Sequence, residues 1–192
     1  YCLSKPEVKK YLTDIMAEAI ELYQPKIFHI GCDEASHTGI CPLCKTKPTG
    51  ELVAAHITYF RDWLAERGIK TMMWHDMLLE SKEWSSTAPA NSHPAGENQS
   101  GYTHSAADLL PKDILMDVWI YRDQKNFPAL KHFQEKGFTV YGCPWYSAEN
   151  NYYFASAVKE CGGAGFIGTS WMYVSRLNPN LTTVLTAEYA WT

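Results

Sequence analysis

Asp33 and Glu34 are two adjacent carboxylic acids that directly follow a short apolar segment. Residues 26–32 (Lys-Ile-Phe-His-Ile-Gly-Cys) form a near-continuous apolar run, which predicts a buried strand of a parallel sheet. Neighbouring carboxylates cannot both ionise without repulsion, so one pKa should rise while the other acid stays charged. A proton donor would then stand beside a permanent negative charge. The alternative is a solvated turn, or an aspartate that caps the next helix.

Four tryptophans stand at or just after the ends of four further predicted strands, which cover residues 70–74, 114–120, 138–143 and 166–172. They are Trp74, Trp119, Trp145 and Trp171. Any one of them could be an ordinary core residue, but four at successive strand ends indicate the walls of one pocket. Aromatic faces suit the apolar faces of sugars, and 14% of the chain is aromatic.

The elements that must position these residues alternate along the chain. Helices are predicted at about 5–24, 50–67, 126–136 and 150–160, with Ser4 and Glu7 forming a capping box at the first. Strands that alternate with helices indicate an α/β fold with a parallel sheet, whose strand ends gather functional residues on one face. Residues 80–111 form a long connection on that face, either a lid or an insertion without a role.

The overall composition excludes several classes of partner. The chain has 192 residues, enough for one domain, and a formal net charge of −4. This charge argues against nucleic acid and anionic membranes as partners. No apolar run approaches the roughly 18 residues of a membrane-spanning helix.

Cys41 and Cys44 form a Cys-x-x-Cys pair, which can supply half of a zinc site. Cys32 and His37 are candidate further ligands. A disulfide, a redox role and reduced structural thiols are the alternatives, and reduced thiols are favoured because the chain has no second ligand pair. We therefore expect no metal site and no cofactor.

Residues 29–34 (His-Ile-Gly-Cys-Asp-Glu) resemble the His-x-Gly-Gly-Asp-Glu signature of family 20 glycoside hydrolases, the β-N-acetylhexosaminidases, with Cys32 in place of the second glycine. The resemblance continues in order at later strand ends and covers nearly the whole chain. The matching positions are Trp74 to Asp76, Trp119, Trp145 with Tyr146, and Trp171. The chain looks closest to the hexosaminidase-D-like branch.

The resemblance implies a (β/α)8 TIM-barrel type of fold, of which this chain would contain about strands four to eight as a single partial catalytic domain over residues 1–192. The missing strands would leave an exposed sheet edge, which favours self-association or completion by a longer protein. An isolated fragment could be inactive for that reason.

The resemblance also implies roles in removing β-linked N-acetylhexosamine from a carbohydrate substrate. Glu34 would be the general acid, and Asp33 would orient the 2-acetamido group, which acts as the internal nucleophile. Tyr146 would bind the acetamido oxygen, and His29 would support the carboxylates. The ring would be enclosed by Trp74, Trp119 and Trp171, with Trp145 completing the aromatic wall.

Two departures from the family's pattern concern the distal hydroxyls of the sugar. Ala148 and Tyr173 stand where many family members have an aspartate and a glutamate. Asp76 and Glu149 are candidates to replace these acids. The departures leave open which C4 epimer is preferred, and they keep a sugar-binding barrel without hydrolytic activity as an alternative.

Overall fold

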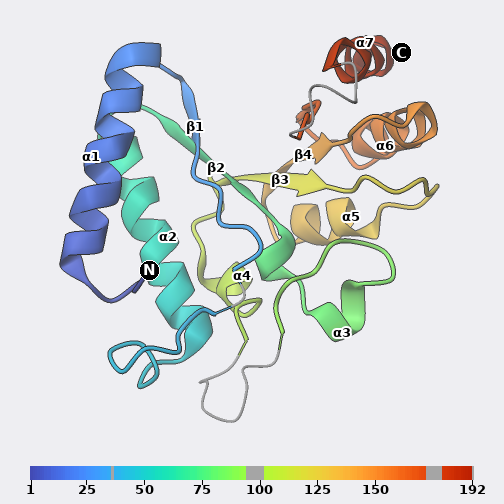
Figure 1. Cartoon of the computed structure of the whole chain (residues 1–192). Coiled ribbons are helices and arrows are strands. Elements are labelled where there is room, and N and C mark those ends of the chain that lie inside the picture. The colour runs from blue at the N-terminus through green and yellow to red at the C-terminus, as the bar shows by residue number, and fades with distance from the viewer. Residues whose placement is uncertain (36, 94–101, 172–178, 192) are drawn as a thin grey trace.

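Five parallel strands lie side by side in chain order in the computed structural model, which describes residues 1–35, 37–93, 102–171 and 179–191 (Figure 1). The strands are β1 (Ile27–His29), β2 (Lys70–Trp74), β3 (Leu115–Trp119), β4 (Thr139–Cys143) and β5 (Gly165–Phe166). Each strand pairs in parallel with the next. This order confirms the predicted α/β fold, because consecutive parallel strands are the arrangement of a TIM barrel.

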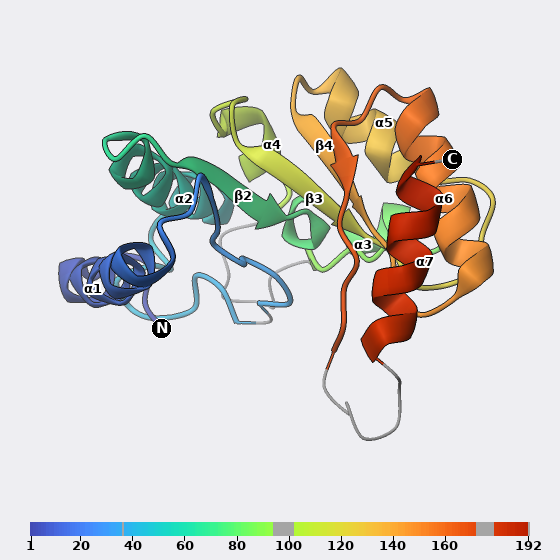
Figure 2. The ribbon, with the colours of Figure 1, turned by 90° about the horizontal axis from the view of Figure 1, so that it is seen from above.

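Helices cover the outer side of the curved sheet, as Figure 2 shows. The longer ones are α1 (Pro6–Tyr23), α2 (Thr49–Ala65), α5 (Pro128–Glu135), α6 (Ala148–Glu160) and α7 (Pro179–Trp191). The short ones are the 3₁₀ helix η1 (Asp76–Leu78), α3 (Ser81–Trp84) and α4 (Ala106–Leu109). The helix α7, which the sequence did not predict, packs against α6 and β5.

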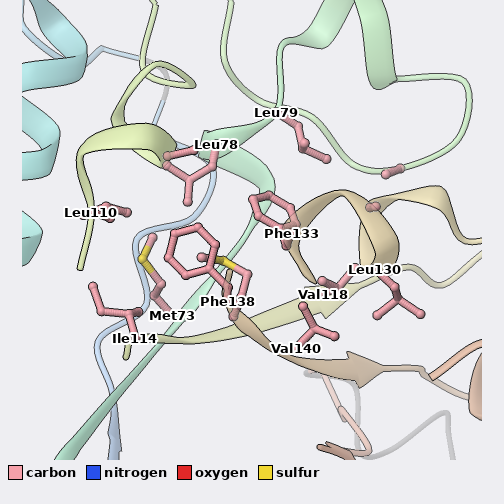
Figure 3. Packing of buried hydrophobic residues seen from close by; sticks show 14 of the residues in the cluster. Met73, Leu78, Leu79, Leu110, Ile114, Val118, Leu130, Phe133, Phe138 and Val140 are labelled. Carbon is pink, nitrogen blue, oxygen red and sulfur yellow. The ribbon is translucent and has the colours of Figure 1, made fainter. Parts of the chain in front are cut away.

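The main hydrophobic core lies between the sheet and these helices (Figure 3). Val118 and Val140 of neighbouring strands are almost completely buried there, together with Leu130 and Phe133 of α5. Because side chains alternate between the two faces of a strand, the residues on either side of Val118 point to the opposite, inner face of the sheet. The inner face is therefore free to carry a site.

Two local predictions are wrong. The N-cap of α1 is Lys5 rather than Ser4, and no side chain caps this helix. The Ser4 hydroxyl instead accepts a hydrogen bond from the Cys44 thiol.

The fifth strand, predicted over residues 166–172, is only two residues long. Beyond Phe166 the backbone still bonds to β4 and the residue after it, through Ile167 N–H to the Gly142 carbonyl and Thr169 N–H to the Pro144 carbonyl.

The connection between β2 and β3 is anchored to the core at both of its ends. Near its start, Ser81 N–H donates a hydrogen bond to the Ser92 carbonyl, and the Thr103 hydroxyl donates to the Met77 carbonyl at 2.7 Å. Leu110 is buried in the main core at the other end. Its described residues are therefore part of the folded domain.

Each outer strand of the described sheet has one neighbour. Within these ranges β1 pairs only with β2, and β5 pairs only with β4. The sheet is thus open at both edges and forms part of a barrel.

None of the described helices combines the length and the apolar character that crossing a bilayer requires.

Candidate active site

Asp33 and Glu34 follow β1 on a sharply turned backbone. Pairing with the β2 region continues as far as Gly31, whose carbonyl accepts from Trp74 N–H at 3.0 Å. Gly31, Cys32 and Glu34 then adopt φ values of 72°, 70° and 47°, in the left-handed region. Non-glycine residues rarely adopt this conformation, and such strained positions concentrate at functional sites. The turn leaves both carboxylate side chains exposed at the end of the strand.

Asp76 fixes the backbone of this turn through a hydrogen bond. Its side chain is completely buried and accepts three hydrogen bonds: Glu34 N–H at 3.0 Å, the Asn91 side-chain amide at 2.7 Å and the Trp119 indole N–H at 3.2 Å. Ala35, the residue after Glu34, directs its N–H to the Met77 sulfur at 3.3 Å. Asp76 therefore joins the turn that carries Asp33 and Glu34 to the β2–β3 connection and the end of β3.

The environment of Asp33 raises its pKa. The largest cause is burial of part of the carboxyl group, which disfavours the charged form, and the nearby Asp76 carboxylate adds repulsion. A hydrogen bond from the backbone and the His29 ring act in the opposite direction. The carboxylate that repels Asp33 thus comes from η1, which follows β2.

His29 is the last residue of β1 and precedes the turn that carries the two acids. Its Nδ1 accepts a hydrogen bond from Gly31 N–H at 3.0 Å, and its Nε2 lies 3.6 Å from Asp117 Oδ2. The other oxygen of the buried Asp117 accepts from the Cys143 thiol at 3.1 Å. Burial and the Asp117 charge hold the pKa of Cys143 well above its usual range, so this thiol stays a hydrogen-bond donor.

An aromatic cluster joins the ends of four strands through Tyr121. The Tyr121 ring centroid lies 5.1 Å from that of Trp119, 5.5 Å from Trp145 and 6.3 Å from Trp171. Its hydroxyl accepts a hydrogen bond from the Trp171 indole at 2.7 Å. Trp171 also lies 6.1 Å from Trp74, so all four predicted tryptophans belong to one cluster.

Both ends of this cluster meet other predicted site residues, His29 and Tyr146. Trp74 packs on the His29 ring at a centroid distance of 4.4 Å, and Trp145 packs on Tyr146 at 4.6 Å. The side chains of Tyr146 and Trp171 remain exposed. A ligand could therefore contact their ring faces and the Tyr146 hydroxyl without rearrangement of the core.

A cavity of about 460 Å³ adjoins the cluster at Trp119 and Tyr121. Trp119, Tyr121 and Arg122 line it from β3 and the residues that follow, and Asn91 and His93 line it from the β2–β3 connection. Its volume is within the range of small-molecule sites.

The structure adds two site residues that the sequence analysis did not select, Asp117 and Tyr121. Alternation along the third strand could have identified them, because Asp117, Trp119 and Tyr121 are separated by the buried core residues Val118 and Ile120. Ala148 is the first residue of α6, and Tyr173 lies outside the described residues.

The Cys-x-x-Cys pair has a different partner from the ones considered in the sequence. Cys41 and Cys44 lie with Cys2 in a group whose sulfur atoms are all within 4.8 Å of one another. Cys32 instead directs its thiol to the Ile30 carbonyl, and neither Cys32 nor His37 belongs to this group.

Comparisons with known proteins identify the family. Residues 1–173 match the family described as glycosyl hydrolase family 20, catalytic domain. The chain is also similar to the crystal structure of a beta-N-acetylhexosaminidase from Bacteroides fragilis NCTC 9343, at 18% identity and a TM-score of 0.47. That match covers 77% of this chain and 26% of that one, so the chain spans about a quarter of its length. No curated protein matches. Because the family match extends over most of the sequence, the chain belongs to glycosyl hydrolase family 20.

Proposed function

We propose that this chain supplies the general acid and most of the aromatic pocket of a β-N-acetylhexosaminidase of the hexosaminidase-D-like branch. The observation that carries the proposal is the position of Asp33 and Glu34, which project from a strained turn beside the aromatic cluster. The family match supports the same reaction class. The substrate would be a carbohydrate that ends in β-linked N-acetylhexosamine.

Glu34 would donate a proton to the glycosidic oxygen as the bond between C1 and that oxygen breaks. The substrate's own acetamido oxygen would attack C1 from the opposite face, and water would later open the resulting ring with Glu34 as base. Two inversions at C1 give net retention. The hydrogen bond from Glu34 N–H to Asp76 would keep the backbone of the acid in one position during both steps.

Asp33 would accept a hydrogen bond from the acetamido N–H, and the Tyr146 hydroxyl would donate one to the acetamido oxygen. A negative Asp33 stabilises the positive charge that develops on the acetamido group. The surroundings that raise the pKa of Asp33 in the free protein also make this carboxylate a better acceptor, because they disfavour its charged form until a partner arrives.

The aromatic cluster would supply the apolar walls of the sugar subsite. Trp74 and Trp171 come from β2 and the segment after β5, while Trp119 and Trp145 come from the ends of β3 and β4. Tyr121 would hold these walls at fixed spacing, because it contacts three of the four indoles.

The test is release of an aryl leaving group from N-acetyl-β-glucosaminide and N-acetyl-β-galactosaminide. It should be run on the chain and on a longer polypeptide that completes the family-20 domain. We expect Glu34→Gln to lower kcat at least about 100-fold, because general acid catalysis contributes that much. Glu21→Gln, on the exposed side of α1, is the matched control and should leave turnover unchanged. Turnover of Glu34→Gln at the wild-type rate would rule out Glu34 as the acid.

A sugar-binding barrel without hydrolytic activity is the second candidate. Ala148 at the start of α6 favours it, because a methyl group cannot bind a sugar hydroxyl. In this case the completed domain would bind N-acetylhexosamine in calorimetry, binding would weaken in Trp171→Ala, and neither aryl glycoside would be cleaved.

A further inference from the structure

Three cysteine thiols from two distant parts of the chain converge beside the start of α1. The Cys2 sulfur lies 3.3 Å from the Cys41 sulfur and 3.4 Å from the Cys44 sulfur. Cys2 precedes α1, whereas Cys41 and Cys44 belong to the segment between β1 and α2. Within the described residues, these thiols form the one group of three or more potential metal ligands.

We propose that Cys2, Cys41 and Cys44 bind one zinc ion through their thiolates. Zinc–sulfur bonds are about 2.3 Å long, so sulfur atoms in a tetrahedral site are about 3.8 Å apart. The observed spacing is slightly shorter and needs only a small outward movement of the side chains to admit the ion. Cys2 and Cys41 are partly exposed, so a water molecule can reach the fourth coordination position.

The backbone around the pair is already arranged for binding. The N–H groups of Cys44 and Lys45 both donate to the Cys41 carbonyl at 2.9 Å, which closes a tight turn between the two cysteines. The buried Cys44 thiol also donates to the Ser4 hydroxyl at 3.3 Å, so the segment before α1 is held against the turn. Little chain ordering is left for the ion to impose.

The ligand set also fits a soft cation. A thiolate is the form that binds metal, and zinc would displace the thiol protons to solvent. Three thiolates without a nitrogen or oxygen ligand favour zinc over magnesium or calcium, which prefer oxygen.

The ion would link the N-terminal segment to the segment that carries Asp33 and Glu34. It would stabilise the path of the chain after the acids without contacting them. The inference does not depend on the proposed hydrolase activity, because metal content and stability are measured without substrate.

The test is the zinc content of the reduced chain, measured by mass spectrometry of the metal after incubation with zinc and removal of unbound ions. We expect about one equivalent in the wild type and in Cys161→Ser, the control, since Cys161 lies at the end of α6 outside the group. The variants Cys2→Ser, Cys41→Ser and Cys44→Ser should each retain less than about 0.2 equivalents. Cobalt in place of zinc should give the sulfur-to-metal charge-transfer band of thiolate coordination.

A second measurement on the wild type covers the case in which a variant does not fold. A chelator should lower the unfolding temperature by several degrees, and zinc but not magnesium should restore it. Less than about 0.2 equivalents of zinc in the reduced wild type would overturn the proposal. So would a disulfide between two of these cysteines that persists in the protein as purified without oxidant.

Discussion

At the scale of single residues, Cys32 is the point where the chain departs from the signature of its family. Its φ of 70° is one that glycine adopts without cost, whereas a residue with a Cβ atom is strained there by about 1 kcal/mol or more. The side chain offsets part of this cost by packing against the main core. The chain therefore holds a cysteine in a backbone conformation that glycine would adopt without strain.

Because of this conformation, the stability cost of a substitution at Cys32 depends strongly on which residue is introduced. Cys32→Gly should change the free energy of unfolding by less than about 1 kcal/mol, since relief of strain offsets the lost contacts. Cys32→Val should destabilise by about 2 kcal/mol or more, because a β-branched side chain is poorly tolerated at positive φ. Chemical denaturation measures both, with Cys161→Val, at a φ of −81°, as the control. Equal costs for valine at the two sites would contradict the strain argument.

Asp33 allows a test of the trade-off between stability and function. Its pKa is raised above the ordinary 3.8, so ionisation is harder in the folded chain than in the unfolded one. The folded state therefore loses stability as pH rises through the interval between the unfolded and folded pKa values, and this loss is absent at lower pH.

Asp33→Asn removes that cost and should raise the unfolding temperature at pH 7, by up to about 2 °C because the carboxylate is solvent-screened. The gain should disappear as pH falls below about 3, where both states of the wild type bind the proton. Thermal unfolding at several pH values measures this, with Glu21→Gln as the control. A variant whose stability relative to the wild type decreases as pH rises from about 3 to 7 would show that ionised Asp33 is stabilised by its surroundings.

At the scale of elements, the strands and most helices could be predicted because each has a local pattern. The apolar run before Asp33 and the alternation around Val118 are readable in the sequence. The helix α7 was missed because Thr182, Thr183 and Val184 in its first half are β-branched residues, which have low helix propensity. Packing against α6, where the Tyr152 and Tyr189 rings lie 5.8 Å apart, overrides that preference.

The candidate site could be predicted only in part, because the sequence shows where strands end but not which distant segments touch. The residues at strand ends were visible because parallel strands bring their ends together. Contacts that cross the fold were not: nothing in the spacing of Cys2 and Cys41 indicates that their sulfur atoms lie 3.3 Å apart. Similarly, the donors that converge on Asp76 come from three separate segments.

The contact between β4 and α6 is set by a glycine. A Cβ atom at Gly142 would lie 2.6 Å from Val158 Cγ2 and 3.1 Å from a ring carbon of Phe166. Gly142→Ala should therefore destabilise the fold by about 2 kcal/mol through overpacking. Adding Val158→Ala removes the obstructing methyl groups, so the double variant should lose less stability than the sum of the single variants. Denaturation of all four proteins measures this coupling, and simple additivity would contradict the packing argument.

At the scale of the whole molecule, the described sheet is an incomplete cylinder with an unpaired strand at each edge. Ile27 on β1 is 40% exposed, and Tyr11, Ile15 and Leu22 of α1 are also exposed. Unpaired strand edges with apolar side chains promote association. The family's barrel would cover both edges, so we infer that residues 1–192 act as one partial domain of that barrel.

The chain by itself should therefore self-associate as its concentration rises. Light scattering should detect this, and Ile27→Lys should shift the equilibrium toward monomer by placing a charge on the exposed strand. Lys26→Arg, which retains the charge at the neighbouring position, is the control. A monomer across the whole concentration range would indicate that the edge is already protected.

The buried carboxylate of Asp76 also has a consequence for local motion. It receives the Glu34 amide and the Asn91 side chain, and the Asn91 amide bonds to its backbone carbonyl. Opening of the β2–β3 connection would thus break contacts that define the turn of the acids. We therefore expect the two segments to open as one cooperative unit, in which amide protons of both exchange with solvent through the same fluctuation. A substrate that orders the turn would then slow exchange in a segment that it does not touch.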